Sequence, residues 1–228
     1  MTATTTGIDV AAHLGAVSRV VEDRTYEGKP MRVVVASRAY DTSIEDLWDA
    51  LTSQERLPRW FAPVDGDLKL GGRFQVKGNA GGTITACVPP KSFSATWEFG
   101  GGVSWISLSL APTKSGGTHL TLEHMMPPAG DHWDKFGPGA VGIGWELGLL
   151  GLGMHVRSKA ARDTFNEHVW GASEEGKEFV SKSGEGWIAA DIKGGEKAVD
   201  ATRRGTATIA FYRGEPPPGT AHPGTTGH

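Results

Sequence analysis

Residues Gly137–Val156, with the sequence GPGAVGIGWELGLLGLGMHV, form the stretch that most limits how this chain can fold. Four of its apolar side chains recur at helical spacing and make one face: Trp145, Leu149, Leu152 and Val156. Three others make a second face: Leu147, Leu150 and Met154. A helix that is apolar on two faces is stable in water only when both are covered. We therefore expect this helix to be buried on more than one side.

Three glycines, Gly144, Gly148 and Gly151, lie along a third stripe of this helix. Each costs about 1 kcal/mol relative to alanine in a helix, so a compensating reason is expected. Close approach of another backbone or room for a ligand would be such a reason. A core helix that merely tolerates glycine is the alternative. Because Glu146 interrupts the apolar run, a core helix is favoured over a membrane span.

Length, charge and cysteine content narrow the class of protein. The 228 residues fit one large domain, or one domain with an appendage, and can form a core with a cavity. The net charge of −3 argues against nucleic acid as the main partner. A single cysteine, Cys87, excludes an internal disulfide and suits a reducing cytoplasm. The first residues lack a basic region followed by an apolar one, so we expect no signal peptide and a cytoplasmic protein.

The N-terminal part is expected to contain a short helix, a strand hairpin and a second helix. Ile8–Val17 is the candidate short helix, and Ser18–Tyr26 and Met31–Tyr40 are two strands joined by a turn with Gly and Pro. The next helix begins with Thr42 and Glu45 at the spacing of a capping box. Its core face consists of Ile44, Leu47, Trp48 and Leu51.

From residue 67 the hydrophobic period changes to two, which is typical of strands. Turn sequences such as GNAGG and KSGG separate six predicted strands: Asp67–Leu70, Arg73–Lys77, Thr83–Val88, Phe93–Phe99, Val103–Ala111 and Thr118–Met126. Short connections predict a mostly antiparallel meander. The expected inward pairs are Phe74 with Val76, Ile84 with Ala86, and Trp97 with Phe99, and on the last strand Leu120, Leu122 and His124 share a face. Such a sheet needs a helix on its concave face, and only Gly137–Val156 is apolar enough.

Two further amphipathic helices are predicted at Ser173–Lys193 and Glu196–Arg213, separated by two glycines. They would either cover the outer face of the central helix or pair with another subunit. The tail after residue 213, GEPPPGTAHPGTTGH, is expected to be disordered because it has almost no apolar side chains.

Five segments carry a family resemblance: SIEDLWDALTSQERLPRWF, GGRF, ACVPPKSFSATWEF, GTHLTLEH and GIGWELGLLGL. As a set they resemble the START-like (SRPBCC) superfamily, and within it most closely the domain of the activator of heat-shock protein 90 ATPase. The resemblance covers roughly residues 17–156. It implies an α+β helix-grip fold of the birch-pollen-allergen type, in which an antiparallel sheet wraps around a long C-terminal helix. The expected organisation is a START-like domain at 1–156, a helical extension packed on it at 157–213, and a disordered tail at 214–228.

Several motifs that suggest other chemistry do not fit their surroundings. Residues 137–142 match G-x-G-x-x-G, but no strand leads into them as a dinucleotide site requires. Residues 171–178 nearly spell a P-loop but lack the Ser or Thr that holds magnesium. The histidines lack metal-ligand spacing, since His119 and His124 face opposite ways on a strand and His132, His155 and His168 match no pattern. Cys87 has no catalytic motif around it. We therefore expect no metal and no cofactor.

The remaining candidate is an apolar pocket with few polar groups, as the family resemblance also implies. Inward-facing His124 would orient a ligand's carbonyl or hydroxyl, or act as an acid–base group; a hydrogen-bonded core histidine is the alternative. Glu146 is the second weak catalytic candidate, with the alternatives that it faces solvent or caps a neighbouring segment. The predicted ligand-binding residues are Trp60, Phe61, Phe74, Trp97, Phe99, His124, Trp145, Gly148 and Leu149.

Three functions remain open, because members of the superfamily resembled carry lipids and hormones, cyclise polyketides or assist chaperones. The first is a protein that binds a small hydrophobic molecule between sheet and helix. The second is a cofactor-independent cyclase or dehydratase in the same cavity, with His124 as acid–base group and Glu146 or Asp131 assisting. The third is a protein-binding module that uses the outside of the sheet. We expect no membrane insertion, and a homodimer is a further prediction.

Overall fold

The computed structural model describes residues 9–128, 130–157, 167–216 and 218. Its strands form one eight-stranded antiparallel sheet: β1 Ser18–Tyr26, β2 Lys29–Tyr40, β3 Val64–Gly66, β4 Arg73–Val76, β5 Gly81–Val88, β6 Ser92–Phe99, β7 Gly102–Pro112 and β8 Thr118–Met126. Their order in the sheet is β1-β2-β8-β7-β6-β5-β4-β3, so only the pairing of β2 with β8 joins strands that are distant in sequence.

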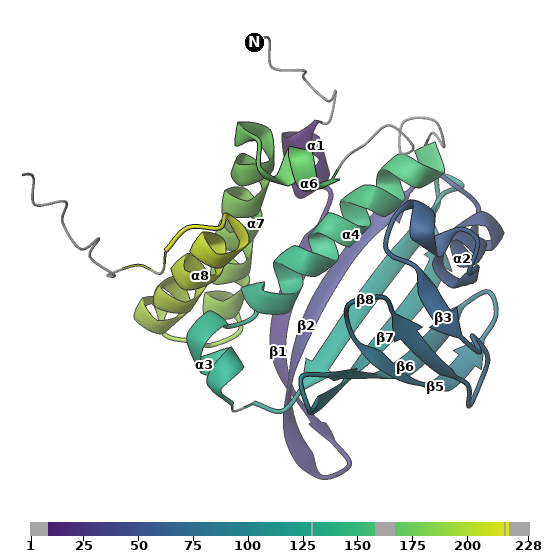
Figure 1. The fold of residues 1–228 in the computed structure, drawn as a ribbon, viewed down its shortest axis with the longest axis horizontal. Coiled ribbons are helices and arrows are strands. Elements are labelled where there is room, and N and C mark those ends of the chain that lie inside the picture. Colours follow the sequence, from purple (N-terminus) through teal and green to yellow (C-terminus); the bar gives the residue numbers. More distant parts are fainter. Residues whose placement is uncertain (1–8, 129, 158–166, 217, 219–228) are drawn as a thin grey trace, which may run out of the picture.

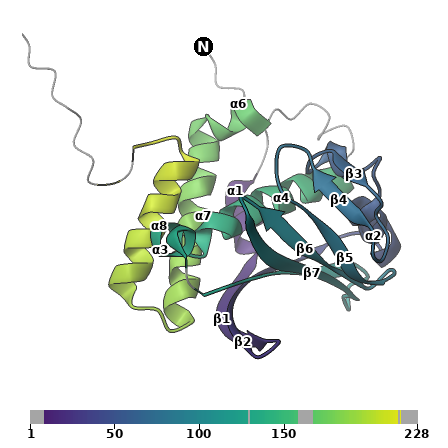
Figure 2. The same ribbon diagram turned by 60° about the horizontal axis from the view of Figure 1, so that its bottom comes forward.

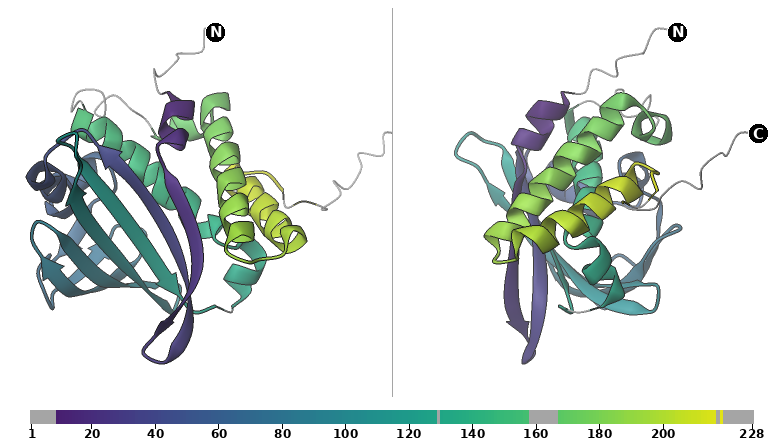
Figure 3. Two further views of the ribbon diagram at one scale, coloured as in Figure 1. Left: turned by 180° about the vertical axis from the view of Figure 1, so that it is seen from behind. Right: turned by 90° about the vertical axis from the view of Figure 1, so that its left-hand side faces the viewer.

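The described helical elements are α1 Val10–Gly15, α2 Ile44–Thr52, the 3-10 turn η1 Leu57–Arg59, α3 Asp131–Phe136, α4 Gly139–Arg157, α6 Glu167–Gly171, α7 Glu174–Lys193 and α8 Ala198–Tyr212. The sheet curls around α4, which lies along its concave face (Figures 1 and 2). Helices α7 and α8 form an antiparallel hairpin, and α7 contacts both β1 and α4 (Figure 3). The predicted α+β helix-grip fold with additional C-terminal helices is confirmed.

Seven of the eight predicted strands are found at or within a few residues of their expected positions, and one is displaced. Strand β3 is Val64–Gly66, whereas the sequence pattern predicts a strand at Asp67–Leu70. That segment is instead part of a loop held by its own backbone, because the Lys69 amide donates to the Asp67 carbonyl at 2.9 Å. Leu70 is 62% exposed as a result. The prediction was wrong because alternation alone does not distinguish a strand from a turn with one buried side chain.

A β-bulge in β5 changes which side chains face inward. The register of β5 against β6 shifts between Ile84 and Ala86, so two residues occupy the space of one. Ile84 is buried as predicted, but Ala86 is exposed and Cys87 takes the inward position. Phe74, Val76 and the inward residues of β8 are buried as predicted.

The start of α2 also differs from the prediction in one detail. Its N-cap is Ser43, whose hydroxyl oxygen accepts a hydrogen bond from the Asp46 amide at 3.2 Å. Thr42 lies one residue earlier and donates to the Asp46 carboxylate at 2.7 Å. The capping box predicted for Thr42 and Glu45 was therefore placed one residue too early.

Helix α4 is covered on two sides, as its two apolar faces predict. On the sheet side Leu149 and Leu152 are buried in the main core, and the Tyr40 hydroxyl donates to the Leu149 carbonyl at 3.1 Å. On the other side Leu150 packs in a second cluster with Trp170 of α6 and Phe179 of α7. By length and composition α4 is apolar enough to span a membrane, yet 56% of its apolar window is buried within the fold, as in a core helix.

Some expectations concern parts of the chain that the structure does not describe. The first residue of the predicted helix Ile8–Val17 lies outside the described residues, and α1 begins at Val10. Most of the tail after residue 213, and residues 158–166, also lie outside them. Two short helices, α3 and α6, had no counterpart among the predicted elements.

The glycines of α4 serve different purposes. A Cβ on Gly142 would lie 2.3–2.6 Å from the indole of Trp187 on α7, so only glycine lets α7 approach this closely. A Cβ on Gly144 would meet the Tyr212 hydroxyl of α8 at 2.9 Å. At Gly148 the nearest atoms, on Trp60 and Phe61, are 3.9 Å away, which is ordinary van der Waals distance. Close helix packing therefore explains Gly142, whereas Gly148 borders open space.

Alanine at these two positions should have opposite effects on stability. Gly148→Ala should raise the free energy of unfolding by up to about 1 kcal/mol, because the helix gains propensity and nothing is displaced. Gly142→Ala should lower it by about 1–3 kcal/mol, because Trp187 must move. Urea unfolding of both variants checks this. Equal effects of the two substitutions would mean that the approach of α7 to α4 is not as described.

Candidate functional site

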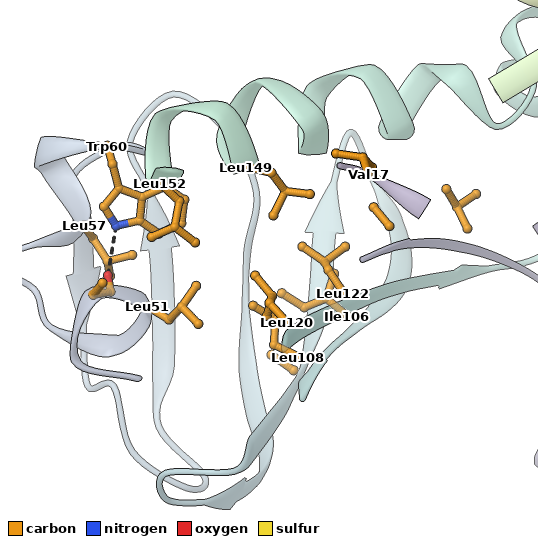
Figure 4. Close-up of a cluster of buried hydrophobic side chains, with 14 of the residues drawn as sticks. Val17, Leu51, Leu57, Trp60, Ile106, Leu108, Leu120, Leu122, Leu149 and Leu152 are labelled. Atoms are coloured by element: carbon orange, nitrogen blue, oxygen red, sulfur yellow. Dashed lines mark hydrogen bonds between the residues drawn. The ribbon is translucent and has the colours of Figure 1, made fainter. Parts of the chain in front are cut away.

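An unfilled apolar space lies between α4 and the half of the sheet that is far from β1. Its volume is about 110 Å³. The wall comes from α2, η1, the strands β3–β8 and α4 and includes Leu57, Trp60, Phe93, Leu120, Trp145 and Leu152. Figure 4 shows part of this wall, with Leu149 and Leu152 below α4 facing Leu108, Leu120 and Leu122 on the strands. We refer to this space as the chamber.

The chamber has almost no polar group in its wall. Among its lining residues only Thr52 and Cys87 have a polar side chain other than an indole. The Thr52 hydroxyl already donates to the Trp48 carbonyl at 2.8 Å. The indole N–H of Trp60 is also occupied, donating to the Ala50 carbonyl at 2.9 Å (Figure 4). The chamber wall therefore presents apolar surface almost exclusively.

Seven of the nine predicted ligand-binding residues line the chamber: Trp60, Phe61, Phe74, Trp97, Trp145, Gly148 and Leu149. Their aromatic rings contact one another, with the Trp97 and Trp145 centroids 5.2 Å apart and Phe61 stacked on Trp145 at 6.3 Å. Phe99 does not belong to this group, because it is 63% exposed at the last position of β6. The alternation that places Trp97 inside continues to Phe99, but the sheet no longer has a covering layer there.

His124 lies behind the chamber wall and both of its ring nitrogens are occupied. The Trp145 indole N–H donates to Nδ1 at 3.0 Å. The second nitrogen, Nε2, therefore carries the proton and donates to the Ser104 hydroxyl at 2.8 Å. That hydroxyl in turn donates to the Trp97 carbonyl at 3.0 Å. This closed chain matches the hydrogen-bonded core histidine that was the alternative to a ligand-orienting or catalytic group.

The surroundings of His124 also oppose protonation. The side chain is 3% exposed, and burial lowers the pKa of His124 to about 4. Among the described residues, no carboxylate contacts the imidazole to favour its charged form. His124 is therefore a neutral member of the core at physiological pH, and it fixes the orientation of Trp145 in the chamber wall.

Glu146 is directed away from the chamber. Its carboxylate accepts two hydrogen bonds from the Arg19 guanidinium, both at 2.6 Å, and is fully buried. Arg19 lies on the inward face of β1, and Gly186 of α7 leaves room for it, since a Cβ there would be 2.9 Å from its Nε. Glu146 thus neither faces solvent nor caps a segment, but joins α4 to β1. This pair was not visible in the sequence, because its partners are 127 residues apart.

The remaining polar candidates give no second site. The Asp131 side chain lies outside the described residues. Within the described part of the chain, no three His, Cys, Asp or Glu side chains are grouped to hold a metal ion. Cys87 also lines the chamber, although strict alternation predicts Ala86 as inward-facing, and only the register shift in β5 reveals its position.

Comparison with known proteins identifies the class of protein. The profile of the activator of Hsp90 ATPase homolog 1-like proteins matches residues 41–152, from just before α2 into the C-terminal half of α4. By sequence, no curated protein matches the chain significantly.

Solved structures extend the match to most of the chain. The crystal structure of CalU16 from Micromonospora echinospora is 31% identical with a TM-score of 0.63, and the alignment covers 77% of this chain and 98% of CalU16. The solution NMR structure of CalU16 gives the same identity and TM-score over 78% and 97%. EF2215 from Enterococcus faecalis, a conserved protein of unknown function, shares the fold at 16% identity, with a TM-score of 0.55 over 82% and 96%.

These matches and the helix-grip architecture define a START-like protein. Within that superfamily, the chain belongs to the family of activator of Hsp90 ATPase homolog 1-like proteins. The family resemblance noted in the sequence is thereby confirmed.

Removing the charge of Glu146 should destabilise the fold. Glu146→Gln should lower the free energy of unfolding by about 3 kcal/mol, because it leaves the Arg19 guanidinium partly buried without an anion. Replacing both residues together, as Arg19→Met with Glu146→Leu, should recover most of the loss, since no uncompensated charge remains. Urea unfolding of the three proteins tests this. Wild-type stability of the single variant would show that the ion pair does not hold α4.

The protein should lose stability as the pH decreases, over a pH window set by the pKa of His124. Its folded pKa of about 4 lies below the ordinary value of about 6.5, so the unfolded state binds more protons between these values. The contribution of neutral His124 to the free energy of unfolding is complete above pH ~6.5 and is lost as pH falls towards 4. Between pH 7 and pH 5 this amounts to about 2 kcal/mol.

Substitution of His124 tests this assignment. His124→Gln should show a correspondingly shallower loss of stability between pH 7 and pH 5, measured by urea unfolding at several pH values. His13 should keep part of the wild-type dependence in the variant, because burial and the neighbouring Arg38 lower the pKa of His13 to about 3. His119→Gln, on the outer face of β8, serves as the control. An unchanged pH dependence in His124→Gln would contradict the assignment.

Proposed function

We propose that this protein binds a small apolar molecule, or the apolar part of a larger one, in the chamber. The observation that carries the proposal is the unfilled space itself. Protein interiors are packed as densely as organic crystals and contain few voids larger than a water molecule. A void of about 110 Å³ costs about 2–3 kcal/mol relative to a filled core. A ligand that fills it would recover much of that free energy.

The size of the chamber bounds the ligand. In another protein, an engineered apolar cavity of about 150 Å³ stays dry and binds benzene. The present chamber is slightly smaller, so it accommodates an aromatic ring or a short branched alkyl group only with slight adjustment of its walls. A complete lipid acyl chain would require larger movement. This supports a compact ligand over a lipid.

The chemistry of the chamber wall favours binding over catalysis. Acid–base catalysis needs a group whose proton can reach the substrate. His124 has both nitrogens occupied and Glu146 is paired with Arg19 on the other side of α4. His124 and Glu146 therefore give no support to the cyclase or dehydratase alternative, and the proposal is a carrier or sensor of the ligand.

The outer face of the sheet gives less support to the third alternative. Its apolar residues Met31 and Val33 are buried, and the exposed Val20 and Val103, at 42% and 47%, lie on strands β1 and β7, which are not adjacent. Arg24 of β1 binds Glu123 of β8 at 2.9 Å across the intervening strand β2, and it also binds Glu22 of its own strand at 2.6 Å. A protein-docking surface is expected to expose its apolar core. The chamber is thus the better-supported site.

A chamber-filling variant tests the proposal with toluene as the probe. Ala95 lines the chamber and is 1% exposed, so Ala95→Ile should occupy much of the space. Saturating toluene should raise the melting temperature of the wild-type protein, because binding to the folded state alone stabilises it. The variant should show no such rise. Saturation transfer NMR should report one saturable site in the wild type alone.

Ser94→Ile is the matched control. It adds a side chain of the same size at the neighbouring position of β6, where Ser94 bonds Ser107 on the outer face. This variant should keep the response to toluene. Absence of saturable binding to the wild-type protein, or unchanged binding to a folded Ala95→Ile variant, would refute the proposed site.

A further inference from the structure

A second hollow lies directly outside the chamber. It has a volume of about 260 Å³ and is bordered by the segment after η1, the β4–β5 turn and α4. Four residues belong to the walls of both spaces: Trp60, Phe61, Val76 and Gly148. The two spaces are therefore neighbours and share these residues as a common wall. We refer to the outer hollow as the vestibule.

Phe61 is the part of this shared wall that is best able to move. Trp60 is 8% exposed and is held by its hydrogen bond to Ala50, while Val76 and Gly148 are fixed in a strand and a helix. Phe61 has no polar anchor, is only partly buried and follows η1 in a loop. Rotation of its ring away from Trp145 would connect the chamber with the vestibule.

Gly148 makes this opening possible. Its missing side chain leaves only a hydrogen atom facing Phe61 Cδ2 and Trp60 Cζ3, both 3.9 Å from where a Cβ would lie. Any larger side chain would extend into the space between the two rings. This opening is a reason for glycine at position 148 in spite of its cost in helix propensity.

The vestibule differs from the chamber because it offers hydrogen-bond donors. Lys77 and Asn79 of the β4–β5 turn border it. Lys77 is exposed and forms no ion pair with another described residue. The Asn79 side-chain oxygen accepts from the Ala80 amide at 2.8 Å, which leaves its NH₂ group as the available donor. A cation and an amide donor suit a ligand group that accepts hydrogen bonds, above all a carboxylate.

We propose that the chamber and the vestibule are two halves of one site for a small amphipathic monocarboxylate. Its compact apolar end enters the chamber past Phe61, and its carboxylate remains in the vestibule against Lys77 and Asn79. This proposal rests on the proposed function, and it adds the chemical class of the ligand and its route of entry. The apolar end is about the size of a benzene ring, as the chamber volume requires.

Three probes with the same apolar end test the ligand class: 4-phenylbutyrate, 4-phenylbutan-1-ol and 4-phenylbutylamine. Titration calorimetry should give one site per chain, with the carboxylate binding about three- to tenfold more tightly than the alcohol and the amine most weakly. Lys77→Gln should bring the affinity for the carboxylate close to that for the alcohol. Lys91→Gln, an exposed lysine at the β5–β6 turn that borders neither space, should leave all three affinities unchanged.

Two further variants test the route of entry. Phe61→Ala should increase both the association and the dissociation rate of 4-phenylbutyrate at least about tenfold in stopped-flow measurements, because the separating ring is gone. Gly148→Leu should weaken binding of all three probes, and its urea unfolding is measured alongside to establish that it is folded. Unchanged rates in Phe61→Ala would overturn the route.

The outcomes separate this inference from the proposed function. Equal binding of alcohol and carboxylate, unaffected by Lys77→Gln, would overturn the carboxylate subsite, while saturable toluene binding would still support the chamber. Failure of the wild-type protein to bind toluene and all three probes would overturn the proposed function and this inference together.

Discussion

The ion pair between Arg19 and Glu146 joins the sheet to α4, and α7 packs against it. Arg19 comes from the inward face of β1, Glu146 from α4, and Gly186 of α7 lies against the guanidinium. A buried carboxylate is tolerated only with a well-placed partner, so this contact fixes both the rotation of α4 and its distance from β1. Once the Glu146 side of α4 is fixed against β1, the side of α4 that carries Trp145 and Leu149 must face the far half of the sheet.

The chamber follows from this asymmetric attachment. On the β1 side, α4 is held by the ion pair and by the Tyr40 hydrogen bond to Leu149. On the far side the sheet curves around the helix (Figure 2). There the large aromatic side chains fill the space between helix and sheet only partly. The glycine at position 148 leaves out a further side chain. An apolar space remains between the helix and the sheet.

The helices after α4 explain why this family member tolerates so apolar a central helix. Leu150 is covered by Trp170 and Phe179 in the chain's own fold, so exposure of that face gives no physical reason for self-association. The homodimer stays a prediction. Near the α7–α8 turn, Arg204 binds both Asp191 and Glu196, which links the two helices by charge as well as by packing.

The sequence by itself determined the fold class, the helix that the sheet surrounds and most of the strands, because hydrophobic periodicity and turn residues report local structure directly. Seven of the nine ligand-binding residues that it predicted line the chamber, because large aromatic side chains on inward faces mark the space between sheet and helix. Only the tertiary structure decided the roles of His124 and Glu146, the exclusion of Phe99 and the inward position of Cys87. Those depend on partners distant in sequence, on a register shift and on where the covering layer ends, and none of these leaves a mark on the local residue pattern.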